Sequence, residues 1–475
     1  MTTASLTSLL ALVDDALHVT PGGKLKVKDE AQLRAKIDAL ASKSALGAGP
    51  EQSLARWLIW EAALALDIVP SSINDLYLAR GRGETPTNFT VPAMNLRALT
   101  FDCARAVFRA AAAIDAGALL FEIARSEIGY TDQRPAEYTA SVLAAAIRQD
   151  YRGPVFIQGD HFQVNGKKYA KDPVGEVNTV KELAAEAISA GFFNIDIDTS
   201  TLVDLSKPTI PEQQALNTGH CAEITEHIRG LEPKGITVSI GGEIGEVGGK
   251  NSTETELRAF IDGYNADLIE RKKRGVAGMS KISIQTGTSH GGVVLPDGKI
   301  ADVAVDFDVL KRLSFVARKE YGLAGAVQHG ASTLPENAFS KFAECEACEV
   351  HLATNFQNML YTALPADLRG EMYDWLKVNA ADERKPSDTD EQFFYKSRKK
   401  AIGPFKARMW NLAEATRDEI SAAWEKQFSF LFEQLNIKDT RRLTEKHISL
   451  TPLHKQPSDF GATDKAAEDV SGLAD

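Results

Sequence analysis

The segment Gly153-Pro154-Val155-Phe156-Ile157-Gln158-Gly159-Asp160-His161 contains the pattern that decides the fold. A glycine precedes a short, mostly apolar run over 154–158, and the ionisable pair Asp160-His161 follows it. Short apolar runs bounded in this way are typical of strands that are buried on both faces of a parallel sheet. We therefore predict a strand here, with Asp160 and His161 at its carboxyl end.

Seven further runs have the same form, and several of them follow directly on a glycine. They span 89–94, 118–123, 192–197, 236–240, 281–285, 323–328 and 349–353. Stretches with helical periodicity lie between runs, at 135–149, 180–190, 211–229 and 254–271. Eight strands that alternate with helices over about 270 residues predict an α/β fold, a (β/α)8 TIM barrel. The alternative is a doubly wound open sheet, but Met94-Asn95-Leu96-Arg97 is not the glycine-rich turn expected after its first strand.

The chain divides into four parts on this reading. Residues 1–85 form a mostly helical N-terminal extension that ends in breaker-rich sequence, 86–365 form the barrel, and 366–450 form a C-terminal helical segment. The polar stretch 451–475 is expected to be a disordered tail. The extension is expected to serve as an oligomerisation element or as a lid.

Composition limits the partners and the compartment. The formal net charge of -11 argues against nucleic acid or an anionic membrane as the main partner, because both reward clustered Lys and Arg. No apolar run reaches the ~18 residues that a membrane helix needs. Four cysteines in 475 residues, and an N-terminus without the basic start of a signal peptide, predict a cytoplasmic protein. Cys345 and Cys348 form a C-x-x-C, which we interpret as two buried thiols rather than a redox pair or half a zinc site.

Ionisable side chains gather where the predicted strands end, and this is the rim that carries the active site of a barrel enzyme. They are Asp160, His161, Asp198, Glu243, His290 and His329. A lone histidine at a strand end is more often a hydrogen-bonded structural residue. Three histidines on one rim, joined by two carboxylates, indicate a metal site instead. Three neutral imidazoles with an open coordination position are the usual arrangement of a catalytic Zn2+.

Small residues follow two of these histidines, in His290-Gly291-Gly292 and His329-Gly330-Ala331-Ser332-Thr333. Glycine lets backbone N–H groups approach a phosphate closely, and the hydroxyls add donors. In barrels the loops after strands seven and eight are the habitual phosphate site. Either motif could also be a plain tight turn.

Six motifs together resemble the class II, metal-dependent ketose-bisphosphate aldolases. The similarity covers residues 90–354, with fainter traces to about 410, and each motif is short. The motifs are Val91-Pro92-Ala93-Met94-Asn95, Gln158-Gly159-Asp160-His161, Asp196-Ile197-Asp198-Thr199-Ser200, the glycine-rich stretch from Gly242 to Gly249, Gly287-Thr288-Ser289-His290-Gly291, and Gln328-His329-Gly330-Ala331-Ser332-Thr333-Leu334-Pro335.

The resemblance implies a role for each matching residue. His161, His290 and His329 would hold a catalytic Zn2+ or another divalent metal, and Asp198 and Glu243 would provide an alternative or second metal position. Asp160 would be the acid/base on the hydroxyl of the carbon that is released as an aldehyde. The substrate and phosphate residues would be Asn95, Gly291, Gly330, Ser332, His351, Ala353 and Thr354.

The resemblance also implies the reaction and its partners. Retro-aldol cleavage of a phosphorylated ketose, such as fructose 1,6-bisphosphate, would give dihydroxyacetone phosphate and an aldehyde through a metal-stabilised enediolate, without a lysine Schiff base. A monovalent cation near the phosphate and a homo-oligomer, dimer or tetramer, are further features of the family.

The chain departs from the family pattern in the substrate shell. The family's acidic pair in the fifth loop is replaced by Lys250-Asn251-Ser252, so that Glu246 or Glu254 would have to move the carbon-bound proton. His351 stands where the family has an asparagine that contacts the enediolate, and Asn355 replaces an acidic residue. Lys396, Arg398 and Lys399 could reach a second phosphate, although a solvated charged face is the plainer interpretation.

Two other functions stay open. A metal-dependent barrel lyase or hydrolase of another kind would use the same rim, although hydrolases usually carry His-x-His on the first strand, which 91–95 lacks. A non-catalytic barrel subunit of a tagatose-bisphosphate aldolase would need none of the rim ligands.

Overall fold

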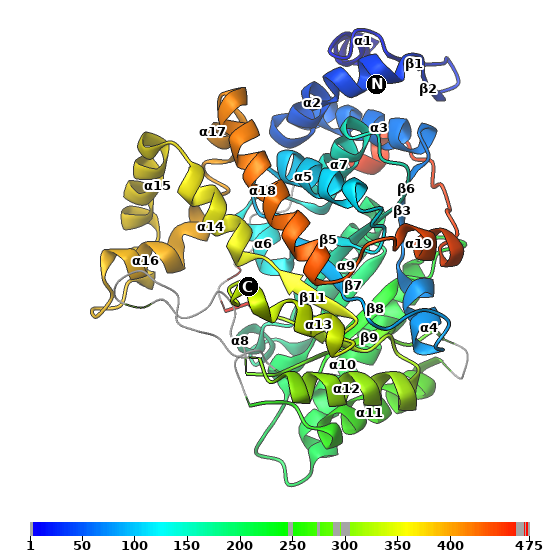
Figure 1. Cartoon of the computed structure of the whole chain (residues 1–475), viewed down its shortest axis with the longest axis vertical. Helices are drawn as coiled ribbons and strands as arrows, with labels where there is room; N and C mark the ends of the chain where they lie inside the picture. Colours follow the sequence, from blue (N-terminus) through cyan, green and yellow to red (C-terminus); the bar gives the residue numbers. More distant parts are fainter. Residues whose placement is uncertain are drawn as a thin grey trace.

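Eight parallel strands close into a barrel at the centre of the molecule (Figure 1). In a computed structural model, residues 3–245, 250–272, 276–287, 295, 305–461, 470, 472 and 473 are described. The barrel strands are β4 (Val91–Asn95), β5 (Leu120–Ala124), β6 (Gly153–Gln163), β7 (Asn194–Asp198), β8 (Ser239–Glu243), β9 (Lys281–Ile284), β10 (Ala326–Gln328) and β11 (Glu349–Leu352). Their order is β6-β5-β4-β11-β10-β9-β8-β7, and a pairing of β6 with β7 closes the ring. The predicted TIM barrel is therefore confirmed, and the open sheet is excluded.

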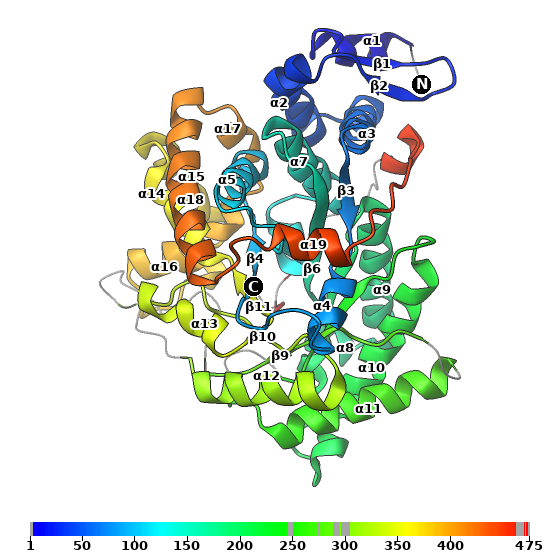
Figure 2. The same cartoon turned by 45° about the vertical axis from the view of Figure 1, so that its right-hand side comes forward.

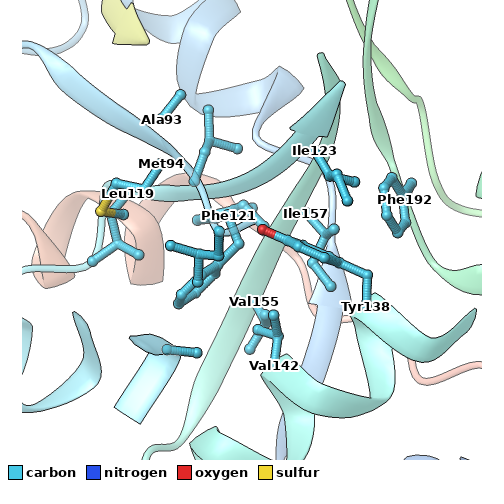
Figure 3. Close-up of a cluster of buried hydrophobic side chains, with 14 of the residues drawn as sticks. Ala93, Met94, Leu119, Phe121, Ile123, Tyr138, Val142, Val155, Ile157 and Phe192 are labelled. Carbon is cyan, nitrogen blue, oxygen red and sulfur yellow. The ribbon is translucent and has the colours of Figure 1, made fainter. Parts of the chain in front are cut away.

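Side chains along the strands alternate between apolar ones that face the helices and polar ones that face the barrel centre. Figure 3 shows Val155 and Ile157 of β6 beside Tyr138 and Val142 of the adjoining helix, and all four are at most 1 % exposed. Successive strand residues point to opposite faces, so Gln158 points into the barrel instead. Burying an aliphatic or aromatic side chain of this size contributes about 1.5–3 kcal/mol, so the outer faces of the strands hold the helices in place.

Helices surround the strands, and their ends follow local capping rules. They are α5 (Thr100–Ala113), α7 (Pro135–Arg148), α9 (Pro173–Ala190), α10 (Ile210–Leu231), α11 (Glu254–Lys272), α12 (Phe307–Tyr321) and α13 (Ser340–Glu344). The side chains of Asp172 and Asp306 accept backbone N–H bonds at the starts of α9 and α12. Gly191 (φ 99°) and Gly322 (φ 69°) end the same two helices in the left-handed region that favours glycine.

Helix α14 (Thr354–Ala363) follows the last barrel strand, and the C-terminal helical segment completes this helical layer. The segment contains α15 (Ala366–Asn379), α16 (Asp390–Ser397), α17 (Lys406–Trp410), α18 (Glu414–Gln434) and α19 (Arg441–His447). Arg109 of α5 donates to Glu425 of α18 (2.5 Å), and the indole of Trp424 donates to the carbonyl of Phe356 (3.1 Å). The long helix α18 thus packs on α5 and α14 as part of the barrel wall.

The N-terminal extension contains strands that its helical pattern did not predict. Its elements are α1 (Thr3–Ala11), β1 (Leu17–Val19), β2 (Leu25–Val27), α2 (Glu30–Leu46), α3 (Gly49–Ala65), β3 (Ile68–Ser71) and α4 (Asn74–Gly81). β1 and β2 pair with each other, and β3 pairs in parallel with the first residues of β6, 153–156. Pro70 lies in β3, which is an edge strand, where a missing N–H is tolerated.

Helix α4 lies at the amino end of the barrel, opposite to the rim that carries the predicted site. The buried guanidinium of Arg80 donates to five carbonyls that precede β4, β10 and β11, those of Thr87, Phe89, Ala324, Glu346 and Ala347. A lid would lie at the other end. This part of the extension therefore closes the bottom of the barrel.

We expect Arg80→Leu to lower the free energy of unfolding by at least about 3 kcal/mol, because it leaves several buried carbonyls without a donor. Denaturant unfolding followed by circular dichroism measures the loss. Arg82→Leu is the matched control, since Arg82 is exposed and bonds only to its neighbour Glu84 within the described part of the chain. Equal stability of the two variants would contradict this role of Arg80.

Residues 451–461 run back to α3, although the polar sequence 451–475 was expected to form a disordered tail. Figure 2 shows the segment after α19 reaching α3. The indoles of Trp57 and Trp60 donate to the carbonyls of Lys455 and Leu453, both at 2.8 Å, and the Lys455 ammonium lies 3.7 Å from the Trp60 ring centre. These contacts order residues 451–461 although their sequence is polar. Among the described residues, no helix combines the length and hydrophobicity needed to cross a membrane.

Candidate active site

A bulge at the end of β6 brings two adjacent side chains to the same side of the strand. The register with β7 shifts between Gly159 and Phe162, and His161 adopts φ 38°. In a regular strand Asp160 and His161 would point to opposite faces, but a bulge re-aims one of them. Gly159 makes room for the bulge, because a Cβ at position 159 would lie 2.4 Å from the Phe162 ring. Asp160 and His161 both reach the barrel centre as a result.

His161 lies among carboxylates from the next two strands. Its Nδ1 is 3.0 Å from Asp198 Oδ2 and 3.3 Å from Glu243 Oε2. Gln163 Nε2 and Ser200 Oγ each donate to Asp198 at 2.6 Å, and Gln285 Nε2 donates to Glu243 at 3.1 Å, so both carboxylates are fixed.

Electrostatics at this cluster favour a bound cation. Burial, followed by the charge of Asp198, raises the pKa of Glu243 to about 7. Burial disfavours a charged His161 ring, yet the carboxylates of Asp160 and Glu243 raise the pKa of His161 well above its ordinary value. Negative charge is thus concentrated where little water reaches, and it must be balanced by protons or by a metal ion.

His329, which directly follows β10, completes the described part of the cluster. The rings of His161 and His329 are 4.3 Å apart, and Ser283 Oγ lies 2.9 Å from His329 Nε2. Donor atoms of Asp160, His161 and His329 lie within 4.8 Å of one another, as do those of His161, Asp198 and Glu243. His290 and Gly291 lie outside the described residues. Imidazole nitrogens with carboxylate oxygens form a donor set that Zn2+ and other divalent transition metals accept, so the residues fit such an ion.

A small cavity adjoins this cluster. Its walls include all the described residues that the sequence assigned to substrate and phosphate: Asn95, Gly330, Ser332, His351, Ala353 and Thr354, together with Glu127, Asp160, His329 and Thr333. Ser332 Oγ accepts a hydrogen bond from the N–H of Ala353 (2.6 Å), which joins the loops after β10 and β11. Gly330 takes φ 68°. Small side chains and exposed backbone suit a compact anion such as phosphate.

Asp160 is held from two sides at the edge of this cavity. Asn95 Nδ2 donates to Asp160 Oδ2 (3.0 Å), and His351 Nδ1 lies 3.1 Å from Asp160 Oδ1. Burial disfavours ionisation, but the positive fields of His161 and His351 outweigh it and hold the pKa of Asp160 well below its ordinary value. Asp160 is therefore an ionised carboxylate with a fixed orientation.

Sequence reasoning missed a layer of charged side chains below the rim. The buried Lys281 ammonium donates to Gln158 Oε1 (2.7 Å) and Asp196 Oδ2 (2.9 Å) and also contacts Glu349. Glu122 lies in the same layer, 3.2 Å from His351 Nδ1. Gln158, Asp196 and Glu349 stand two positions before Asp160, Asp198 and His351 on the same strand face, so a period of two could have identified these three. Carboxylates raise the pKa of Lys281, which disfavours the free amine needed for a Schiff base.

Glu127 was also missed, because it lies in α6 (Arg125–Tyr130) rather than at a strand end. Its carboxylate accepts from Asn95 Nδ2 (2.8 Å), Arg97 Nε (2.6 Å) and the Ala124 N–H (2.9 Å). It thereby fixes the Asn95 amide that holds Asp160.

The remaining candidates lie in other surroundings. Glu254 pairs with Arg258 on the surface of α11, and Glu246 is outside the described residues. Lys396 pairs with Asp388 (2.9 Å), while the Arg398 guanidinium bonds Asn358 and packs on two tyrosine rings. Lys399 lies over the Tyr130 ring (5.7 Å). Cys345 and Cys348 are free, buried thiols, as expected.

Comparison with known proteins identifies a family whose sequence model matches most of this chain. A sequence model of the family described as "Fructose-bisphosphate aldolase class-II" matches residues 85–423. A solved structure described as a probable tagatose 6 phosphate kinase from Sinorhizobium meliloti 1021 aligns with a TM-score of 0.52 at 14% identity, over 74% of this chain and 100% of that chain. A fructose-bisphosphate aldolase from Campylobacter jejuni gives 0.42 at 15% identity, over 76% and 93%. The YdjI aldolase from Escherichia coli K12 gives 0.41 at 14% identity, over 73% and 99%. No curated protein matches.

Proposed function

Because this chain belongs to the class-II fructose-bisphosphate aldolase family, we propose that it catalyses the reversible, metal-dependent aldol cleavage of a phosphorylated ketose to dihydroxyacetone phosphate and an aldehyde. One observation carries the proposal. The Asp160 carboxylate, held by Asn95 and His351, lies between a cluster of imidazoles and carboxylates and a cavity of small residues. Those are the acid/base, the metal donors and the anion cradle that such a cleavage needs.

The metal would be held by His161, His329 and His290, with Asp198 and Glu243 at an alternative or second position. When bound, a divalent ion such as Zn2+ supplies Lewis-acid stabilisation for the negative charge that develops as the carbon–carbon bond breaks. The family resemblance also suggests a monovalent cation beside the phosphate.

Asp160 would take the proton from the hydroxyl whose carbon leaves as the aldehyde, and would return it in the synthetic direction. Its two oxygens are held by Asn95 and His351, so it meets this hydroxyl in one orientation. The residue that moves the carbon-bound proton is Glu246 or Glu254 in this proposal, and a surface ion pair with Arg258 weakens the case for Glu254.

The phosphate of the ketose would lie against Gly330, Ser332, Ala353 and Thr354, with Gly291 added from the sixth loop. Backbone N–H groups can approach the anion closely at these small residues, and hydroxyls complete its shell. The four cysteines are free, which supports a reducing, cytoplasmic location, and a homodimer or homotetramer is proposed from the resemblance.

A panel of ketose phosphates tests the function. We expect the purified protein to release dihydroxyacetone phosphate from at least one of fructose 1,6-bisphosphate, tagatose 1,6-bisphosphate and fructose 1-phosphate. Incubation with EDTA should abolish the release, and added Zn2+ should restore it. Cleavage that persists at full rate in metal-free protein would contradict the proposal. Protein without bound metal and without activity would favour the non-catalytic subunit.

A further inference from the structure

A continuous line of buried contacts joins the N-terminal extension to Asp160. The phenol of Tyr77, in α4, donates to Glu349 Oε2. The other oxygen of Glu349 lies 2.7 Å from His351 Nε2, and His351 Nδ1 lies 3.1 Å from Asp160 Oδ1. All four residues are at most 4 % exposed, so water competes little for these contacts.

Glu349 is the fixed point of this line. Besides Tyr77 and His351, it receives the Lys281 ammonium and the Gln158 amide (2.9 Å). These donors come from α4 and from three different barrel strands. The Glu349 carboxylate therefore has little freedom to turn, and it sets the position of whatever bonds to it.

His351 links the fixed Glu349 carboxylate to Asp160 at the rim of the barrel. An imidazole whose two nitrogens both lie on carboxylates has its ring plane fixed, because rotation would break one contact or both. Asp160 Oδ1 is consequently fixed by His351, while Oδ2 is fixed by Asn95.

We propose that Tyr77, Glu349 and Lys281 are positioning residues, which act through His351 to hold the Asp160 carboxylate towards the hydroxyl that it deprotonates. This inference rests on the proposed function, since it takes the role of Asp160 from it. Tyr77 precedes the region matched by the family, residues 85–423. The extension would therefore be part of the catalytic machinery as well as the floor of the barrel.

Tyr77→Phe removes only the phenol oxygen, so it tests the contact between Tyr77 and Glu349. The matched control is Tyr264→Phe, since Tyr264 is also fully buried and its phenol donates to Thr225 (3.1 Å) between α11 and α10, far from this line. We expect Tyr77→Phe to lower kcat for ketose cleavage about five- to tenfold, with KM and metal content within twofold of wild type, because small displacements of a catalytic group reduce the rate steeply. Tyr264→Phe should keep the wild-type kcat, even if it lowers the melting temperature as much as Tyr77→Phe does.

A partial reaction separates this role from a general disturbance of the site. Exchange of the carbon-bound proton of dihydroxyacetone phosphate with deuterium from D2O needs enolisation but no hydroxyl proton of the ketose. We expect Tyr77→Phe to exchange at the wild-type rate while it cleaves slowly. A parallel fall in both rates would overturn the inference.

A double-mutant cycle tests the path through His351. We expect Glu349→Gln alone to lower kcat about a hundredfold. In a His351→Asn background the same change should have almost no further effect, because the link is already cut. Additive losses would overturn the inference, as would a Tyr77→Phe enzyme with normal cleavage. A wild-type protein that cleaves no ketose would overturn the proposed function and this inference with it.

Discussion

His161→Ala should yield a folded protein that has lost both its divalent metal and its turnover. His161 belongs to two of the four donor groups among the described residues, one with Asp160 and His329 and one with Asp198 and Glu243. Its removal therefore weakens either metal position. We expect a fall in kcat/KM of at least about 10^4-fold, because the bond-breaking step loses its electrophile as well as one anchor of the site.

Metal analysis of the purified protein, together with the cleavage assay, measures both effects. His18→Ala is the control, because His18 is exposed in the small β1–β2 hairpin. It should keep the wild-type metal content and rate. A His161→Ala protein with a full complement of metal would show that the ion lies elsewhere.

We expect Asp160→Asn to retain the bound metal ion and to cleave the ketose much more slowly. The amide has the shape of the carboxylate and can keep its neighbours Asn95 and His351, but it cannot accept the hydroxyl proton. General-base catalysis of this kind contributes about 10^2- to 10^4-fold, so kcat should fall by that factor while KM changes little.

The exchange of dihydroxyacetone phosphate with D2O distinguishes this loss from a collapsed site, since it should continue in Asp160→Asn. Asp102→Asn provides a second buried carboxylate for comparison, because Asp102 bonds to Arg105 and Arg417 on the barrel wall. That change should alter stability and leave kcat intact. Equal losses of cleavage and exchange in Asp160→Asn would contradict its assignment to the hydroxyl proton.

The barrel could be predicted because its physical signals are local. Each strand is a short apolar run, several follow a glycine, and the intervening helices are long enough to show their period. β3 could not be found in this way, since its four residues follow directly on α3 and gain their partner only from β6, more than eighty positions later. The ordering of residues 451–461 likewise depends on Trp57 and Trp60, which the tail meets only in the folded chain.

The candidate-site residues at the rim of the barrel could be predicted from the sequence, but the charged residues in the layer below the rim were not. Strand ends identified Asp160, His161, Asp198, Glu243 and His329, and the structure brings these five side chains together. The sequence did not show that Asp160 and His161 would face the same way, because that depends on a bulge and on a left-handed φ that a histidine rarely adopts.

The charged layer below could have been found. Glu349 and His351 are two residues apart on one strand, as are Asp196 and Asp198. A strict period of two extends a rim of ionisable side chains downward by one layer, whereas apolar interiors are the usual expectation for a barrel. Lys281 makes this layer tolerable, because its ammonium neutralises part of the buried negative charge.

The position of Arg80 has an evolutionary consequence. Its guanidinium binds the peptide groups that lead into three strands, so these peptide groups depend on the extension for a hydrogen-bond donor. A descendant that deleted the first eighty residues would inherit open strand ends and would need new side chains to close them. Gain or loss of this segment should therefore coincide with substitutions at the amino ends of β4, β10 and β11.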